Sequence, residues 1–146
     1  MFTQPNNQQN IFYIDDDPDD LWLFKEAAKS LGKSVTAFRQ SEQLLNAMLS
    51  PPPTPSVVFV DLNMGDRSGF EVVEDIRQHQ KLLSLPLVIY STSDNRKTIE
   101  TCRKLGTALY VIKPAKMKAI SKVIQHVTSI DWNNHQITDE NFVIKI

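Results

Sequence analysis

The sequence is poor in the features that mark several large classes of protein. Its single cysteine, Cys102, cannot form an internal disulfide. No apolar run approaches the roughly 18 residues that a membrane-spanning helix needs. Residues 1–10 are polar, rich in Gln and Asn, and lack the apolar core of a signal peptide. We therefore expect a cytoplasmic protein that does not enter a membrane, with residues 1–10 as a flexible polar tail.

Charge of one sign is not in excess either. The 16 Lys and Arg residues are nearly balanced by 17 Asp and Glu residues, and the basic residues are spread along the chain. A protein that wraps nucleic acid needs a basic patch or stripe, so nucleic acid is not an expected partner. At 146 residues the chain can bury one ordinary core, which predicts a single folded domain.

What the sequence does contain is an alternation of short apolar runs with longer amphipathic ones. This alternation is typical of a parallel β-sheet whose strands are joined by helices. The run at 57–60, Val-Val-Phe-Val, is apolar on both faces and predicts a buried central strand. The predicted strands are 11–14, 35–38, 57–60, 87–90 and 108–112. The expected fold is therefore α/β, with five βα units.

Five helices are predicted from apolar residues that recur three and four positions apart. Gly32 and Gly106 are expected to end the first and fourth helices, and Ser41 to cap the start of the second. The proline-rich segment 50–55 predicts a stiff loop before the third strand.

The periodic pattern changes near the end of the chain. We expect the folded domain to cover 11–128 and residues 129–146 to form a C-terminal extension. Within the extension, residues 141–146 are compatible with a short strand or with a docked tail.

Polar side chains follow four of the predicted strands at the point where each strand ends. They are Asp15, Asp16 and Asp17 after the first strand, Asp61 after the third, Ser91 and Thr92 at the fourth, and Lys113 after the fifth. In an open parallel sheet, ligands bind beyond the carboxyl ends of the strands. These side chains are therefore expected to meet in one crevice.

The clustered carboxylates indicate a magnesium site. Carboxylates that crowd together repel one another unless they bind protons or a cation. Mg²⁺ prefers oxygen ligands and commonly takes one or two carboxylates together with phosphate oxygens. We expect Asp16 and Asp61 as direct ligands, Asp15 to act mainly through a water, and the backbone carbonyl of Asn63 to complete the set.

Asp61 is the predicted phosphoacceptor. An Asp carboxylate can act as a nucleophile and form an acyl phosphate. Phosphoryl transfer depends mainly on positioning and on neutralising charge. We therefore expect Lys113 and the cation to share the phosphoryl oxygens, and Ser91 to hydrogen-bond a third oxygen.

These residues resemble the receiver domain of two-component response regulators. The resemblance covers roughly residues 11–128, and Ser91 lies 30 residues after Asp61 while Lys113 lies 22 after Ser91. Its motifs are Ile-Phe-Tyr-Ile-Asp-Asp-Asp-Pro at 11–18, Val-Asp-Leu-Asn-Met at 60–64, Tyr-Ser-Thr-Ser at 90–93 and Tyr-Val-Ile-Lys-Pro at 110–114.

The resemblance implies a flavodoxin-like, doubly wound sheet of five parallel strands in the order 2-1-3-4-5, with helices on both faces. It implies a stand-alone response regulator with Mg²⁺ as cofactor, a histidine kinase or histidine phosphotransfer protein as phosphodonor, and a downstream protein partner; a homodimer is left open. In the family, the hydroxyl matching Ser91 moves toward the phosphate and the aromatic matching Tyr110 turns inward. That movement reshapes the surface of helix four, strand five and helix five. The family also has a cis peptide before the proline matching Pro114.

Three details depart from or refine the family pattern. Gly65 stands where the family usually has proline, which predicts a more mobile loop. Ser91 replaces the commoner threonine and keeps the hydroxyl. Asn63 and Ser93 occupy positions at which the family tunes hydrolysis of the acyl phosphate; both are small and polar, which predicts a short or intermediate phosphoryl lifetime.

Two other functions remain open at this point. A haloacid-dehalogenase-like phosphohydrolase would also use an Asp nucleophile, but it needs a second Asp two residues later, where this chain has Asn63. A receiver-like binding module that is never phosphorylated is the other alternative. Of the remaining acids, we assign Asp17, Asp19 and Asp20 to the start of a helix, where the helix dipole favours them. Tyr110 is either a half-buried strand residue or the switch aromatic.

Overall fold

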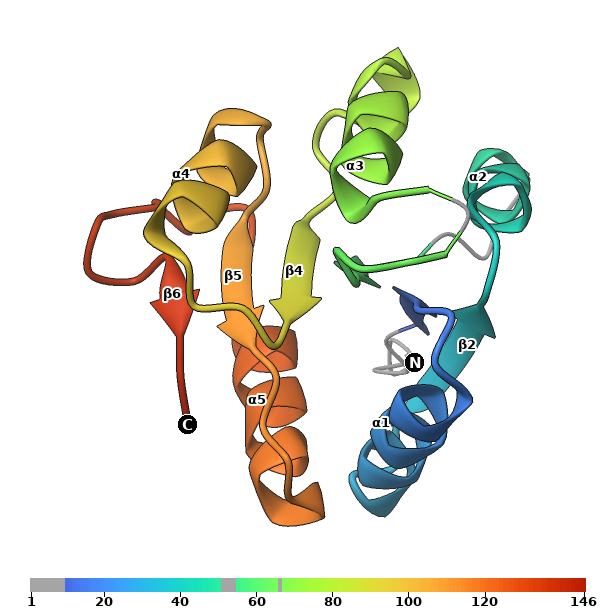
Figure 1. The fold of residues 1–146 in the computed structure, drawn as a ribbon, viewed down its shortest axis with the longest axis vertical. Helices are drawn as coiled ribbons and strands as arrows, with labels where there is room; N and C mark the ends of the chain where they lie inside the picture. The colour runs from blue at the N-terminus through green and yellow to red at the C-terminus, as the bar shows by residue number, and fades with distance from the viewer. Residues whose placement is uncertain (1–9, 51–54, 66) are drawn as a thin grey trace, which may run out of the picture.

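A computed structural model describes residues 10–50, 55–65 and 67–146 of the chain. In these ranges the chain forms one parallel sheet in the order β2-β1-β3-β4-β5-β6 (Figure 1). The strands are β1 (Asn10–Ile14), β2 (Ser34–Phe38), β3 (Val57–Val60), β4 (Leu87–Ser91), β5 (Leu109–Ile112) and β6 (Val143–Ile144). The first five lie in the predicted order. Residues 1–9 of the predicted tail and 51–54 of the predicted loop lie outside the described residues.

Helices cover both faces of the sheet, as predicted. They are α1 (Pro18–Ser30), α2 (Ser41–Leu49), α3 (Gly69–Arg77), α4 (Arg96–Lys104) and α5 (Met117–Ser129), with a short 3₁₀ helix, η1, at Gln80–Leu82. Figure 1 shows α1 and α5 side by side on one face and α2, α3 and α4 on the other. None of the helices in the described part of the chain is long and apolar enough to cross a bilayer.

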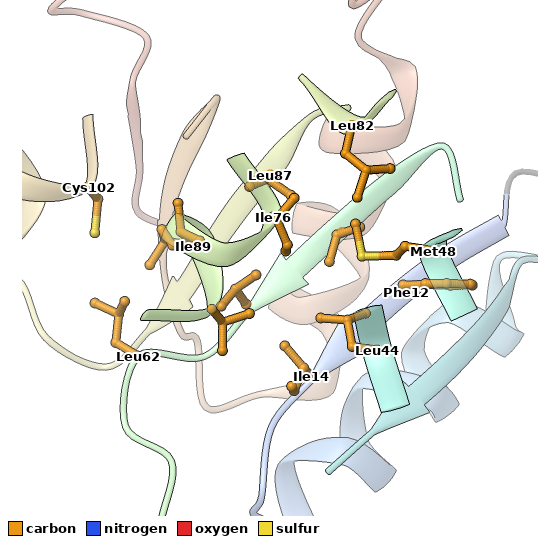
Figure 2. Packing of buried hydrophobic residues seen from close by; sticks show 14 of the residues in the cluster. Phe12, Ile14, Leu44, Met48, Leu62, Ile76, Leu82, Leu87, Ile89 and Cys102 are labelled. Carbon is orange, nitrogen blue, oxygen red and sulfur yellow. The ribbon is translucent and has the colours of Figure 1, made fainter. Parts of the chain in front are cut away.

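Two apolar cores follow from the strand alternation. In β1, Phe12 and Ile14 pack toward α2, α3 and α4, whereas Ile11 and Tyr13 pack toward α1 and α5. Figure 2 shows the first of these cores, into which α2 contributes Leu44. Successive strand residues point to opposite faces, so a strand covered on both faces must be apolar throughout. All four residues of β3 are buried, which confirms the prediction of a central strand.

The predicted C-terminal ends of α1 and α4 are confirmed, whereas the predicted N-cap of α2 is wrong. Gly32 and Gly106 have positive φ values of 70° and 92° just after α1 and α4, a conformation that glycine adopts without strain. Ser41 is not the N-cap of α2. The amide of Leu44 already donates to the carbonyl of Gln40, so the helix begins one residue earlier than predicted, and Ser41 is buried in its first turn.

The C-terminal extension adds a sixth strand that the five-stranded prediction lacked. Val143 and Ile144 pair in parallel with Tyr110 and Val111 of β5. The Phe142 side chain is buried in the core on the α4 side, so the segment docks by apolar packing as well as by backbone pairing. The open choice between a strand and a docked tail is thus settled as a short strand. Two paired residues carry too little periodicity to predict it firmly.

Candidate functional site

The predicted site residues gather at the carboxyl edge of the sheet. Backbone pairing continues past the strand ends: the amide of Asp61 donates to the carbonyl of Ile14 (3.0 Å), and the amide of Lys113 donates to the carbonyl of Ser91 (2.8 Å). These bonds fix where the first side chain beyond each strand emerges. Carboxylate oxygens of Asp15, Asp16 and Asp61 consequently lie within 4.8 Å of one another.

Asp15 is held by three hydrogen bonds. Its Oδ1 accepts the amide of Asp17 at 2.9 Å, and its Oδ2 accepts the Nζ of Lys113 at 2.8 Å and the hydroxyl of Tyr13. Burial, followed by the Asp15 charge, raises the pKa of Tyr13, so this phenol stays protonated and donates. Both oxygens of Asp15 are engaged, which is consistent with its predicted indirect role at a cation.

Asp16 is bound by the loop that follows Asp61. The amide of Gly65 donates to Oδ2 of Asp16 at 2.6 Å. Proline has no amide proton, so a chain with proline at this position could not make the bond. Glycine here therefore adds a donor over the site, an effect separate from the loop mobility that the sequence predicts.

The Lys113 ammonium lies among three carboxylates. Its Nζ is 2.8 Å from Asp15, 2.8 Å from Asp20 and 3.2 Å from Asp61. Burial alone would lower the pKa of Lys113, but the hydrogen bonds to Asp15 and Asp20 outweigh it and the pKa is raised. The side chain is therefore a fixed cation. Its Nζ also lies 5.5 Å from the centre of the Tyr90 ring, where the ring face favours a positive charge.

The charged form of the Asp61 carboxylate is disfavoured by its surroundings. Burial raises the pKa of Asp61 to about 6, the Lys113 ammonium opposes the rise, and the Asp15 charge adds to it. A carboxylate in this setting is stabilised by a further positive charge. The oxygens of Asp15, Asp16 and Asp61 are hard ligands close together, so the donor set suits Mg²⁺.

At the end of β4, Ser91 connects to Tyr110 through Ser93. The Oγ of Ser91 accepts the amide of Ser93 at 3.1 Å, and the Tyr110 hydroxyl donates to the Ser93 carbonyl at 2.7 Å. Tyr110 is fully buried, not half-buried, and its ring lies in the core on the α4 side. The Tyr110 side chain is thus enclosed in the core, and its role as a switch stays a prediction.

Gly69 was not singled out from the sequence, yet it packs directly against the backbone of Asp61. A Cβ at this position would lie 2.3 Å from the carbonyl oxygen of Asp61, so any other residue would displace the backbone that carries the predicted phosphoacceptor. A signal was available: Ser68 and Glu71 form a capping box, which places Gly69 at the first position of a helix that begins against this loop.

Two predicted residues are less engaged. Thr92 and Asn63 are exposed, and their roles stay predictions. Asp20 lies in the first turn of α1, as predicted, and its carboxylate has a further contact, to Lys113, that was not predicted. No sequence signal indicates this contact, because Asp20 lies within α1 and not at the end of a strand.

A family comparison agrees with this geometry. The family model of the response regulator receiver domain matches residues 11–125. The chain belongs to this family. It is 25% identical over 140 residues to response regulator Rcp1 of Synechocystis sp., with 88% of this chain and 92% of that protein covered. It is 23% identical over 131 residues to the two-component response regulator ARR2 of Arabidopsis thaliana, covering 90% of this chain but only 19% of ARR2.

Solved structures share the fold. The Mn(2+)-bound form of response regulator Rcp1 superposes with a TM-score of 0.71 at 22% identity, covering 89% of this chain and 99% of that one. Response regulator RPA3017, from red light signalling in R. palustris, gives a TM-score of 0.77 at 22% identity, with 89% and 98% covered. At these identities the likeness establishes the receiver fold. The phosphohydrolase alternative is not favoured by any of these matches.

Proposed function

We propose that this receiver accepts a phosphoryl group on Asp61 from a histidine kinase or a histidine phosphotransfer protein, in a reaction that depends on Mg²⁺. The observation that carries the proposal is the convergence of three carboxylates and one ammonium at the carboxyl edge of the sheet. Mg²⁺ held by Asp16 and Asp61, with Asp15 through a water and the carbonyl of Asn63, would neutralise charge on the carboxylates and on the phosphoryl oxygens.

The chemical step is a transfer between two nucleophiles. An oxygen of the deprotonated Asp61 carboxylate attacks phosphorus and forms an O–P bond, while the N–P bond to the donor histidine breaks. The electron pair of that bond returns to the imidazole nitrogen, and Asp61 has no proton to lose. Lys113, already 3.2 Å from Asp61, accompanies the phosphoryl group as a counter-charge. The Ser91 hydroxyl, which accepts the Ser93 amide, keeps its own proton to donate to a phosphoryl oxygen.

The output of the switch is protein binding or relay. We propose that Ser91, Thr92 and Tyr110 carry the change of state to the surface of α4, β5 and α5. The peptide before Pro114 is proposed to be cis, as in the family. The surface has an extra component here, because β6 pairs along β5. A downstream protein, or a second copy of the chain, would therefore meet the extension 129–146 as well as the receiver 11–128. We place this chemistry in the cytoplasm.

The phosphoryl lifetime is proposed to be short or intermediate. Asn63 is exposed beside the acceptor, which is consistent with access of water. The Ser93 hydroxyl accepts the amide of Asn95 at 3.2 Å and so is tied to the start of α4. A phosphoprotein that survives for many hours with Mg²⁺ present would contradict this proposal.

The function is tested by incubating the chain with acetyl phosphate and Mg²⁺ and measuring the intact mass. We expect a gain of one phosphoryl group that is lost in Asp61→Asn, lost when the metal is chelated, and kept in Asp19→Asn, which changes an exposed acid of α1. No gain with small donors or with histidine kinases would instead support a binding module that is never phosphorylated.

A further inference from the structure

Lys113 has more carboxylate partners than the proposed reaction requires. An ammonium has three N–H donors and no acceptor. The Nζ of Lys113 is within 3.2 Å of carboxylate oxygens of Asp15, Asp20 and Asp61, so the three donors are matched by three acceptors. A phosphoryl oxygen can bind this ammonium only if one of these contacts is released or shared.

The three carboxylates differ in how easily they can be released. Asp15 is fully buried and is also bound by Tyr13 and by the amide of Asp17. Asp61 is the proposed acceptor and stays beside the phosphoryl group. The Asp20 side chain is 33% exposed, so water can replace Lys113 there at small cost.

Asp20 also differs from its neighbour in sequence. Asp19 and Asp20 both lie in the first turn of α1, where the helix dipole favours an acid. Only Asp20 reaches the ammonium, at 2.8 Å; the Asp19 side chain is exposed, and its backbone amide donates to the Asp17 carboxylate. The helix dipole therefore accounts for an acid at both positions, but only Asp20 has a second role, the contact to Lys113.

We propose that Asp20 is a positioning residue that holds the Lys113 ammonium in the unphosphorylated receiver and competes with the phosphoryl group for it. The inference rests on the proposed function of Asp61. On phosphorylation, Lys113 exchanges the Asp20 oxygen for a phosphoryl oxygen, no covalent bond changes in this exchange, and Asp20 is left to solvent. Asp20 thereby slows phosphorylation and disfavours the phosphorylated state.

The test compares Asp20→Asn with Asp19→Asn, since both remove one charge from the same helix turn. At saturating Mg²⁺, the rate constant for phosphorylation by acetyl phosphate is expected to rise about two- to fivefold in Asp20→Asn, the range of a partly exposed charge pair, and to change less than twofold in Asp19→Asn. Asp20→Glu, which keeps the carboxylate, should stay near the wild-type rate. Asp20→Ser is a second uncharged variant and should match Asp20→Asn.

A second readout avoids turnover. Beryllofluoride with Mg²⁺ mimics the phosphoryl group, and its half-saturating concentration can be followed through the amide signals of Ser91 and Tyr110. We expect Asp20→Asn to lower this concentration by a similar factor. A merely structural role for Asp20 would leave it unchanged or raise it.

Different results would overturn the role of Asp20 and the phosphorylation of Asp61. If the wild-type chain gains a phosphoryl group on Asp61 and Asp20→Asn is no faster than Asp19→Asn, only the role of Asp20 is overturned. If the wild-type chain gains none with any donor, the proposed function falls and this inference falls with it.

Discussion

Strand β5 borders two regions of the molecule, one built from buried charges and the other from apolar contacts. At its carboxyl end lies the site, in which Asp15, Asp61 and Lys113 bring buried charges together. Along its open side lies β6, which docks by backbone pairing and by the buried ring of Phe142. In the site, burial disfavours the charged form of Asp61, whereas the extension adds apolar contact and lengthens the sheet. We therefore expect that each region can be perturbed with little effect on the other.

The largest expected effect is in the site. In metal-free buffer, Lys113→Met should lower the free energy of unfolding by about 3–5 kcal/mol, because the buried carboxylates of Asp15 and Asp61 lose their counter-charge. Urea unfolding measures this. Mg²⁺ should stabilise the variant more than the wild type, since the ion supplies the missing charge. Lys118→Met, on the exposed surface of α5, is the control and should change stability little. Equal stabilisation of Lys113→Met and the wild type by Mg²⁺ would contradict this prediction.

A slightly smaller effect is expected in the extension. Phe142→Ala should lower the free energy of unfolding by about 3 kcal/mol, since it empties a buried position under the Arg103 guanidinium, 5.7 Å from the ring centre. Val143→Ala, at a position that is 36% exposed, is the matched control and should cost well under half as much. The affinity for Mg²⁺ should be unchanged in both variants. A parallel loss of metal affinity would show that the two regions are coupled.

The smallest effect separates the regions by pH. The Asp61 pKa is raised from 3.8 to about 6 in the folded chain, so between these values the folded chain binds more protons than the unfolded one. The contribution of this carboxyl to stability is therefore full below pH 3.8 and is lost as pH rises through 6. In metal-free buffer at pH 7, Asp61→Asn should be more stable than wild type by about 1–2 kcal/mol.

That gain should disappear as the pH falls below 4, where the wild-type carboxyl is itself neutral. Thermal unfolding from pH 3.5 to 7.5 measures the trend, and Phe142→Ala provides a comparison whose deficit should not follow the same curve. A constant difference between Asp61→Asn and wild type across this range would mean that the Asp61 pKa is not raised.

Much of the fold could be predicted because burial imposes a period on the sequence. Residues 57–60 are apolar on both faces, and a strand with that pattern must be covered on both faces. The glycines that end α1 and α4 were equally direct, since few other residues adopt a positive φ. Strand β6 was predicted only as one of two alternatives for residues 141–146, because two paired residues show no periodicity. Its docking depends on the fit of Phe142 to a core built by distant segments.

The candidate site divides in the same way. Its residues at strand ends could be placed together from topology alone, because parallel strands end at one edge. The contact of Asp20 with Lys113 could not, since it depends on how α1 crosses the sheet after the chain has left β1. The hydrogen bond from Gly65 to Asp16 lies between these cases: a change from proline always adds an amide donor, but its acceptor is set by the loop's path.

Tyr110 belongs to both regions at once. Its backbone amide donates to the carbonyl of Phe142 at 2.9 Å, and its hydroxyl donates to the carbonyl of Ser93 at 2.7 Å. A hydrogen-bonded amide exchanges with deuterium only when its bond opens. The rate of deuterium uptake at this amide therefore measures how often β6 separates from β5. The NMR signals of the Tyr110 ring report on the loop that contains Ser93. One residue can thus show whether the two regions open together or in turn.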